Sequence, residues 1–247
     1  MKPENLNIIS KEQLYDFLLK NKKDKTPFSL IRFGDGEGLF SFPEWNVRSR
    51  FIRACLKHWG EIPLPEERDK IARNIRRSYL ECDFAGIPTA FRFSENSEKL
   101  WAKTVHSLIH LYEHPQVVDM NIHIFMLEDN FYNKLIKHED VFYISCRNVD
   151  SVLFEKGAKS IEKILISPQY RFEEIKPKEK FYQQVPVIEK KLREIDLTGK
   201  LCLFGAGVAG KQLGLIMKEQ GGRVVDIGSV FDYWLGFGNR SWIRKKL

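Results

Sequence analysis

The residues best suited to chemistry in this sequence lie together near its N-terminus, in the segment Phe28-Ser-Leu-Ile-Arg-Phe-Gly-Asp-Gly-Glu37. Asp35 and Glu37 are separated by one glycine, and Arg32 lies three residues before this pair. Two carboxylates on one turn can direct their oxygens at one point, which suits Mg²⁺ or Mn²⁺, especially when a phosphate completes the coordination shell. The alternative is a polar turn whose carboxylates only keep the chain soluble. Arg32 likewise has two alternative roles: a fork-like contact with phosphate, or an ion pair with Asp35 or Glu37.

An apolar strand is expected to position these groups. Phe28 to Phe33 is a run of aromatic and branched residues of the kind found in buried strands. Gly34 and Gly36 then allow a sharp, partly left-handed backbone where the strand ends. The arginine and both carboxylates should therefore lie at the carboxyl end of a buried strand.

A second glycine-rich turn lies near the C-terminus, where an apolar run at 201–204 leads into Gly205-Ala-Gly-Val-Ala-Gly210. The pattern predicts a strand, a helix over 208–220 and a further strand over 223–227. Phosphate oxygens can meet free backbone N–H groups at the start of such a helix. Lys211, just inside the helix, is expected either to touch phosphate or to lie in solvent.

The spacing after this turn resembles that of a dinucleotide site, because Asp226 follows Gly207 by 19 residues. A dinucleotide fold needs further strand–helix units, however, and only 20 residues follow Ile227. The turn therefore indicates half of a nucleotide site whose other half lies earlier in the chain. Two alternatives remain open: glycines that only allow close helix–strand packing, and an S-adenosylmethionine site.

Composition favours a folded globular protein. A hydrophobic content of 43% and a charged content of 30% are ordinary for that class, and 247 residues suffice for one domain, which we expect over 1–247. The net charge of +7 favours anionic partners only weakly. The four cysteines form no C-x-x-C pair, which argues against a zinc site and fits a reducing compartment. With no signal sequence or membrane-spanning run, we expect a cytoplasmic protein.

Further apolar runs predict strands that alternate with helices. The expected strands are 122–127, 141–146 and 163–167, and the expected helices begin after Ser10, at Pro65 and at 97, with further helical or polar stretches at 128–138, 150–156 and 179–194. Continuous apolar strands separated by helices predict a mainly parallel sheet covered on both faces.

Three other features carry weaker signals. His106, His110 and His114 recur at four-residue spacing, and histidines placed in this way on a helix can bind zinc. The sequence has no H-E-x-x-H motif, and Pro115 indicates that the helix frays at the third histidine, so a metal role is not favoured. Three arginines at 73, 76 and 77 are expected on a solvated helix face rather than at a nucleic-acid site. Residues 168–180 are a candidate mobile loop, and the basic segment 242–247 is a frayed tail or a contact with an anionic membrane.

Taken together, the two glycine turns resemble those of a known family, the bacterial glycosyltransferases of the GT-D fold, first catalogued as a domain of unknown function. That family has an Arg-x-Gly-Asp-Gly-Glu segment after an early strand, a glycine-rich strand–helix turn near the C-terminus, and an Asp-Ile-Gly sequence. Here these are Arg32–Glu37, Gly205–Gly210 and Asp226–Gly228, which span about 200 residues. The turn of this chain has more glycines than many members carry, which bears on how a nucleotide would be oriented.

The resemblance implies a Rossmann-like α/β transferase with a mainly parallel sheet flanked by helices. It implies a nucleotide-diphosphate sugar as donor, with a UDP-sugar expected, and Mn²⁺ or Mg²⁺ held by the D-x-E pair Asp35 and Glu37. A cation there would stabilise the departing diphosphate. The expected nucleotide-sugar-binding residues are Arg32, Gly34, Gly36, Gly205, Gly207 and Asp226.

The acceptor is expected to be a glycan, a glycoprotein or a lipid-linked molecule, with no nucleic-acid partner and with peripheral contact to the inner membrane face. An inverting reaction needs a carboxylate that deprotonates the acceptor hydroxyl. Asp232 is the candidate, and its alternative role is that of a turn residue before a packed Trp234. Two other functions remain open: a non-catalytic nucleotide-binding module and an NAD(P)-dependent oxidoreductase.

Overall fold

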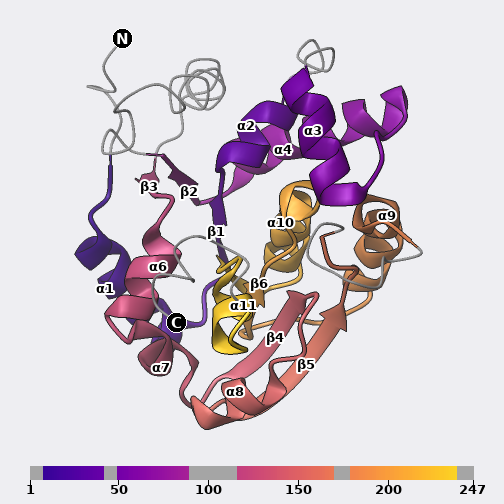
Figure 1. Cartoon of the computed structure of the whole chain (residues 1–247). Helices are drawn as coiled ribbons and strands as arrows, with labels where there is room; N and C mark the ends of the chain where they lie inside the picture. The colour runs from indigo at the N-terminus through magenta and orange to yellow at the C-terminus, as the bar shows by residue number, and fades with distance from the viewer. Residues whose placement is uncertain (1–7, 42–48, 89–115, 170–178, 238–247) are drawn as a thin grey trace.

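A parallel β-sheet forms the centre of the protein in the computed structural model, which describes residues 8–41, 49–88, 116–169 and 179–237. The sheet has seven strands in the order β3-β2-β1-β7-β6-β4-β5, and every pair of neighbours is parallel (Figure 1). All strands therefore end at one edge, called the carboxyl edge below, and begin at the opposite amino edge. The predicted fold class, a Rossmann-like α/β sheet flanked by helices, is confirmed.

The strands are β1 (Phe28–Arg32), β2 (Phe84–Ile87), β3 (Val117–Asp119), β4 (Asp140–Ser145), β5 (Ser160–Leu165), β6 (Leu201–Phe204) and β7 (Arg223–Asp226). The helices before β4 are α1 (Lys11–Asp24), α2 (Asp35–Phe40), α3 (Ser49–Trp59), α4 (Pro65–Glu81), α6 (Ile122–Glu128) and α7 (Phe131–Ile136). Those after β4 are α8 (Asp150–Glu155), α9 (Phe181–Leu192), the 3₁₀ turn η4 (Val208–Gly210), α10 (Lys211–Glu219) and α11 (Val230–Trp234).

Two hydrophobic layers cover the two faces of the sheet. On one face Ile31 and Phe204 belong to a core that includes buried residues of α3, α4, α9 and α10. On the other face Leu30 and Leu203 belong to a core with α1, α6, α7 and α11. Adjacent strand residues thus enter opposite layers, as the alternation of side chains along a strand requires. The central strands β1, β4, β6 and β7 are almost entirely buried because both faces of the sheet are covered there.

Local signals set several helix starts as predicted. Ser10 caps α1, since its Oγ accepts a hydrogen bond from the Gln13 N–H at 3.2 Å and the Gln13 side chain accepts from the Ser10 N–H at 2.9 Å. Pro65 occupies the first turn of α4, where its missing N–H costs nothing. Gly221, with φ of +87°, follows the end of α10.

Two predictions about local structure were wrong. The run 122–127 forms helix α6 rather than a strand, and Ile122, His123 and Met126 are its buried residues. A short apolar run fits a buried strand and a buried helix equally well, so periodicity alone does not decide between them. Gly34 has φ of −105° and Gly36 lies within α2, so neither adopts a left-handed backbone.

Strands β2 and β3 were not predicted, although they form one side of the sheet. β2 is only four residues long and contains alanine and glycine, which are poor strand formers. β3 has three residues. Both strands are held in place by pairing, since Arg32 lies opposite Gly86 and Ile87 opposite Asp119.

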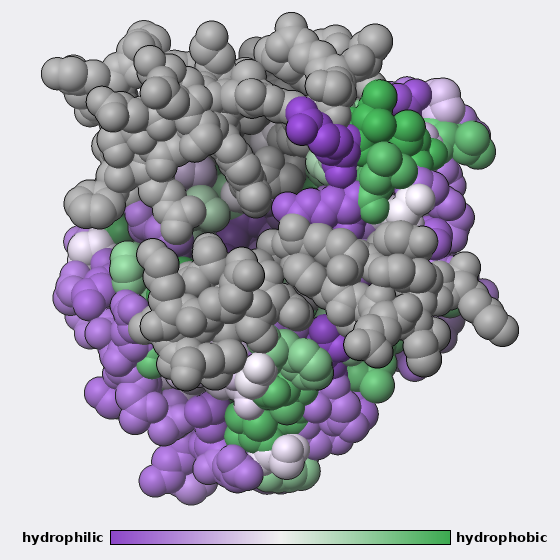
Figure 2. Space-filling model, in the orientation of Figure 1, coloured by the Kyte–Doolittle hydropathy of each residue, from purple (hydrophilic) through white to green (hydrophobic). Residues whose placement is uncertain are grey.

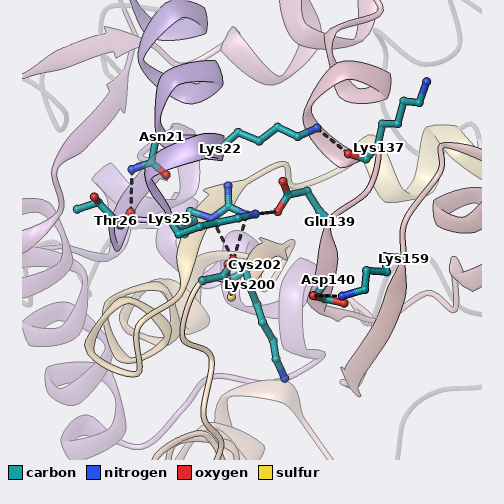
Figure 3. A network of polar contacts seen from close by, with 12 residues as sticks. Asn21, Lys22, Lys25, Thr26, Lys137, Glu139, Asp140, Lys159, Lys200 and Cys202 are labelled. Carbon is teal, nitrogen blue, oxygen red and sulfur yellow. Dashed lines mark hydrogen bonds and ion pairs between the residues drawn. The ribbon is translucent and has the colours of Figure 1, made fainter.

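A buried ion cluster lies at the amino edge of the sheet, around Arg223 at the start of β7. Arg223 and Glu139 are 1% and 2% exposed and form an ion pair. Lys25 approaches the same carboxylate, with its Nζ 2.6 Å from Glu139 Oε2, and the two side chains point toward each other in Figure 3. The Arg223 guanidinium also donates to the Gly199 carbonyl at 3.1 Å. These contacts leave the buried charges compensated.

The other predictions from the sequence have mixed outcomes. The predicted helix from residue 97, the three histidines at 106, 110 and 114, the centre of the loop at 168–180 and the tail at 242–247 lie outside the described residues. None of the four cysteines forms a disulfide. Arg73 and Arg77 are exposed, as expected of a solvated face, and Arg77 makes surface ion pairs with Glu81 and Glu219. Arg76 instead is half-buried and donates to the Ser41 carbonyl. No helix in the described ranges is long and apolar enough to cross a bilayer.

Candidate active site

The strand order changes direction at the carboxyl edge between β4 and β6, and we call this switch point the crevice. After β4 the chain continues to β5 on one side, and after β6 it continues to β7 on the other. Ligands of open α/β sheets bind outside the carboxyl ends of strands whose connections diverge in this way. The glycine-rich turn begins at this point, because the Gly205 N–H donates to the Ile144 carbonyl of β4 at 2.9 Å.

Four charged side chains meet beside this crevice, where β1 and β7 end. We call Arg32, Glu37, Lys211 and Asp226 the charge cluster. Lys211 Nζ lies 2.6 Å from Asp226 Oδ2 and 3.0 Å from Glu37 Oε1. Arg32 Nη2 lies 3.2 Å from Asp226 Oδ1, and the Arg32 N–H donates to Asp226 Oδ2 at 3.2 Å. The sequence-predicted residues Arg32, Glu37 and Asp226 are thus brought together.

The cluster holds two positive and two negative charges away from water. Burial alone would raise the pKa of the Asp226 carboxyl, but Lys211 and Arg32 hold that pKa below its usual value of 3.8. Burial likewise opposes the charge on Lys211, and the carboxylates of Asp226 and Glu37 outweigh it and raise the lysine pKa above 10.5. Asp226 and Lys211 are therefore both charged at neutral pH. Lys211, which was expected in phosphate contact or in solvent, is 5% exposed and ion-paired.

Within the described residues Arg32 forms its ion pair with Asp226 rather than with Glu37, and its contact with phosphate stays a prediction. Its ion-pair partner is Asp226, and its Nε also donates to the Asp226 carbonyl at 2.9 Å. Its Nη1 donates to the Met120 carbonyl at 3.2 Å and lies 2.7 Å from His123 Nδ1. A guanidinium only donates, so His123 Nδ1 is the acceptor in this contact.

The Asp-Ile-Gly sequence has a steric reason in this arrangement. Gly228 adopts φ of +49°, and a Cβ at this position would lie 2.1 Å from Arg32 Nη2. That nitrogen is held by Asp226, so the glycine leaves the space in which the Arg32–Asp226 pair forms. Any larger residue would separate the two charges.

The glycine turn itself has the backbone that only glycine adopts without strain. Gly207 has φ of +57° and ψ of −157°, and η4 and then α10 follow it directly. A Cβ at Gly205 would lie 2.8 Å from the Gly228 carbonyl oxygen, so this glycine permits close packing. The packing interpretation of the motif thus applies at Gly205, while the nucleotide interpretation stays a prediction at Gly207.

Asp232, the predicted base, lies in α11 and pairs with an arginine that follows β4. Arg147 Nε donates to Asp232 Oδ1 at 3.0 Å, and the two side chains are 12% and 15% exposed. The Arg147 guanidinium also stacks over the Phe237 ring at 4.2 Å. Among the described residues, no donor is recorded for Asp232 Oδ2. This pair belongs to the crevice end of the edge, separate from the charge cluster.

Glu37 is the residue of the predicted metal pair whose side chain the structure describes, and its contacts do not fit a divalent ion. Glu37 Oε2 accepts from the Gly34 N–H at 2.9 Å, and Oε1 faces the Lys211 ammonium. Both oxygens are thus engaged by protein donors, and the Lys211 ammonium occupies the position beside Oε1 that a metal ion would take. The described ranges contain no group of three or more His, Cys, Asp or Glu residues placed to hold a metal. Asp35 begins α2, and its side chain is outside the described atoms.

Comparison with known proteins now identifies the family. A family model described as a GT-D fold-like domain matches residues 9–234. The chain belongs to this GT-D fold-like family. The resemblance inferred from the two glycine turns is therefore confirmed. Among curated proteins, no sequence matches the chain significantly.

Solved structures share the GT-D fold. A glycosyltransferase of the domain of unknown function 1792 from Streptococcus sanguinis superposes with a TM-score of 0.63 at 19% identity, covering 94% of this chain and 85% of that one. A second structure of domain 1792, which has a distinct glycosyltransferase fold, gives a TM-score of 0.61 at 17% identity, covering 92% of this chain and 79% of that one. At these identities the likeness shows the fold.

Three residues of this GT-D fold-like site were missed or misplaced by sequence reasoning. His123 was hidden in a run predicted to be a strand, and Arg147 lies in a short loop without a motif. Lys211 follows the last glycine of the turn, so its position was visible. Its partners were not, because Glu37 is 174 residues away in the sequence (211 − 37).

Proposed function

We propose that this GT-D fold-like protein is a glycosyltransferase that moves a sugar from a nucleotide-diphosphate sugar, with a UDP-sugar as the expected donor. Family and fold support the transferase class. The main support for a nucleotide sugar as substrate is the Gly207 turn. This turn precedes a helix at the point where the connections of β4 and β6 diverge. Phosphate oxygens accept hydrogen bonds from backbone N–H groups at such a helix start.

The reaction assigns roles to the crevice residues. The bond between the anomeric carbon and the diphosphate oxygen breaks, and the acceptor hydroxyl oxygen bonds to that carbon. The diphosphate leaves with the electron pair, and Arg147 is one cation near the crevice that can bind its oxygens. Asp232 Oδ2 takes the acceptor proton, while its Oδ1 stays paired with Arg147.

The charge cluster bears on the rival functions. In an NAD(P) enzyme an acidic residue at this spacing binds ribose hydroxyls. Both Asp226 carboxylate oxygens are instead engaged by Arg32 and Lys211, and the residue is 2% exposed. This arrangement argues against an oxidoreductase. A purely regulatory nucleotide-binding module would need the glycine turn but not Asp232.

Asp232→Asn separates a transferase from a binding module. The amide retains the Arg147 contact but cannot take a proton, so UDP release from a UDP-sugar should fall about 10²- to 10⁴-fold with unchanged donor affinity. Thermal shifts across UDP-, GDP- and ADP-sugars identify the donor, and UDP release is then measured with that donor. Asp129→Asn, on the surface, is the matched control.

Two results would contradict the proposal. Stabilisation by NAD(P) and by none of the nucleotide sugars would support the oxidoreductase. Binding of nucleotide sugars without any release of UDP, GDP or ADP, in wild type and variant alike, would support a regulatory module.

Gly207→Ala tests the turn independently. A Cβ there has room, with the Gln169 side chain 3.6 Å away, so the expected cost of about 1–3 kcal/mol comes from the backbone conformation. Gly199→Ala is the control, because Gly199 has φ of +69° at the amino edge and similar room. Urea unfolding should show a similar loss in both variants. Calorimetry should show weakened nucleotide binding in Gly207→Ala only, and equal binding in both would exclude the turn from the site.

The proposal includes a lipid-linked acceptor and contact with a membrane through helix α3. Helix α3 exposes Ile52 and Leu56 and carries Arg53 and Lys57 but no acidic residue. Figure 2 shows hydrophobic side chains gathered on the described part of this face, near the region where Figure 1 places α3. A basic helix with exposed apolar residues suits the surface of an anionic bilayer, where a lipid-linked acceptor would be found.

A further inference from the structure

Lys211 lies where a cation between two carboxylates would lie. Its Nζ is 3.0 Å from Glu37 Oε1 and 2.6 Å from Asp226 Oδ2. The second oxygen of each carboxylate is engaged as well, Glu37 Oε2 by the Gly34 N–H and Asp226 Oδ1 by Arg32. The two carboxylates thus already bind a positively charged group.

The balance of charge opposes a divalent ion at Glu37. The cluster contains Arg32 and Lys211 against Glu37 and Asp226, a net charge of zero. A metal bound to Glu37 Oε1 would either lie beside the Lys211 ammonium or displace it. The first places like charges in contact within a poorly solvated site. The second requires Lys211, which is 5% exposed at the start of α10, to leave Asp226.

We propose that Lys211, and not a divalent metal ion, is the cation that Glu37 holds at this site. The inference rests on the nucleotide-sugar transfer proposed above. Glu37 is then a positioning residue, which together with Asp226 fixes the ammonium. An ammonium has three N–H donors, and among the described residues only Glu37 and Asp226 engage it. The third donor serves an anionic oxygen of the donor diphosphate.

Removal of Lys211 should increase metal binding rather than decrease it. Removing Lys211 leaves Glu37 and Asp226 as carboxylates without their shared cation, a pair that suits Mn²⁺. Lys211→Ala should therefore gain a Mn²⁺ site that the wild-type protein lacks. Lys211→Ala with Glu37→Gln should lose that gained site again.

Mn²⁺ alone is the first probe, with binding measured by electron paramagnetic resonance of the free ion. Wild type and Glu37→Gln should bind equally, and Lys211→Ala should bind one more ion and gain thermal stability with Mn²⁺. A wild-type Mn²⁺ site that Glu37→Gln removes would overturn the inference. The comparison of wild type with Glu37→Gln needs no lysine variant, so it decides the question even if Lys211→Ala fails to fold.

The second probe is UDP, titrated in EDTA and in Mn²⁺. Wild-type affinity should be the same in both, and Lys211→Ala should bind UDP more weakly in EDTA and recover in part with Mn²⁺. UDP binding that requires Mn²⁺ in wild type and loses this requirement in Glu37→Gln would overturn the inference and leave the proposed function intact. Failure of every nucleotide to bind in either buffer would instead overturn the proposed function, while the Mn²⁺ comparison would still decide what Glu37 holds.

Discussion

Asp226→Asn is expected to lower the free energy of unfolding by about 3–5 kcal/mol, because it removes one partner from a buried ion cluster. Asp226 is 2% exposed and compensates both Arg32 and Lys211. An amide has no charge, so Glu37 alone would face two buried cations. Urea unfolding monitored by tryptophan fluorescence measures the change.

The control for this variant is Asp129→Asn. Asp129 pairs with Lys11 at 2.9 Å on the surface, where both side chains are more than a third exposed, so its loss should cost at most about 1 kcal/mol. A loss at Asp226 no larger than that at Asp129 would mean that the charge cluster contributes little to stability. Nucleotide binding should be lost in Asp226→Asn and retained in Asp129→Asn, since only Asp226 belongs to the charge cluster.

Glu139→Gln is the other substitution with a large expected effect, also about 3–5 kcal/mol, at the opposite edge of the sheet. Glu139 compensates Arg223, which is 1% exposed, and it also binds Lys25 (Figure 3). The neutral amide would leave the Arg223 guanidinium buried without a counter-charge. Urea unfolding should report the loss, while nucleotide affinity of the folded protein should be unchanged because the amino edge is remote from the crevice.

Two further variants show whether charge is the cause. Lys159→Ala, drawn in the same view, removes an exposed pair with Asp140 and should change stability by at most about 1 kcal/mol. Replacing both Glu139 and Arg223 by leucine and methionine should recover most of the loss, since an apolar pair of similar volume removes the unpaired charge. No recovery in the double variant would mean that packing or the Gly199 contact, rather than charge, accounts for the effect.

Asp226→Asn and Glu139→Gln affect the buried charges at the two ends of one strand, β7. β7 is Arg223-Val-Val-Asp226, and both charged ends are buried. The sequence predicts a strand over 223–227 that includes both charged residues, and it assigns Asp226 to the nucleotide-sugar site. In the structure each end has a counter-charge from a distant segment, Glu139 at the amino edge and Arg32 with Lys211 at the carboxyl edge.

The sequence by itself determined the local elements with strong signals. The strands at β1, β4, β6 and β7 follow from continuous apolar runs bounded by turns, and α1 and α4 follow from their caps. These depend on residues within a few positions of one another, so they are visible in the chain. The two glycine turns likewise indicated the family, because their order and spacing are properties of the chain.

Tertiary structure alone decided the partners at the site and the state of ambiguous segments. Helix α6 was chosen over a strand because its buried side chains fit beside α7 and α11, and β2 and β3 exist because β1 offers them an edge. Arg32 meets Asp226 across 194 positions (226 − 32), and Lys211 meets Glu37 across a similar separation. Such pairs form only when parallel strands end at one edge, and no local pattern states which strands are neighbours.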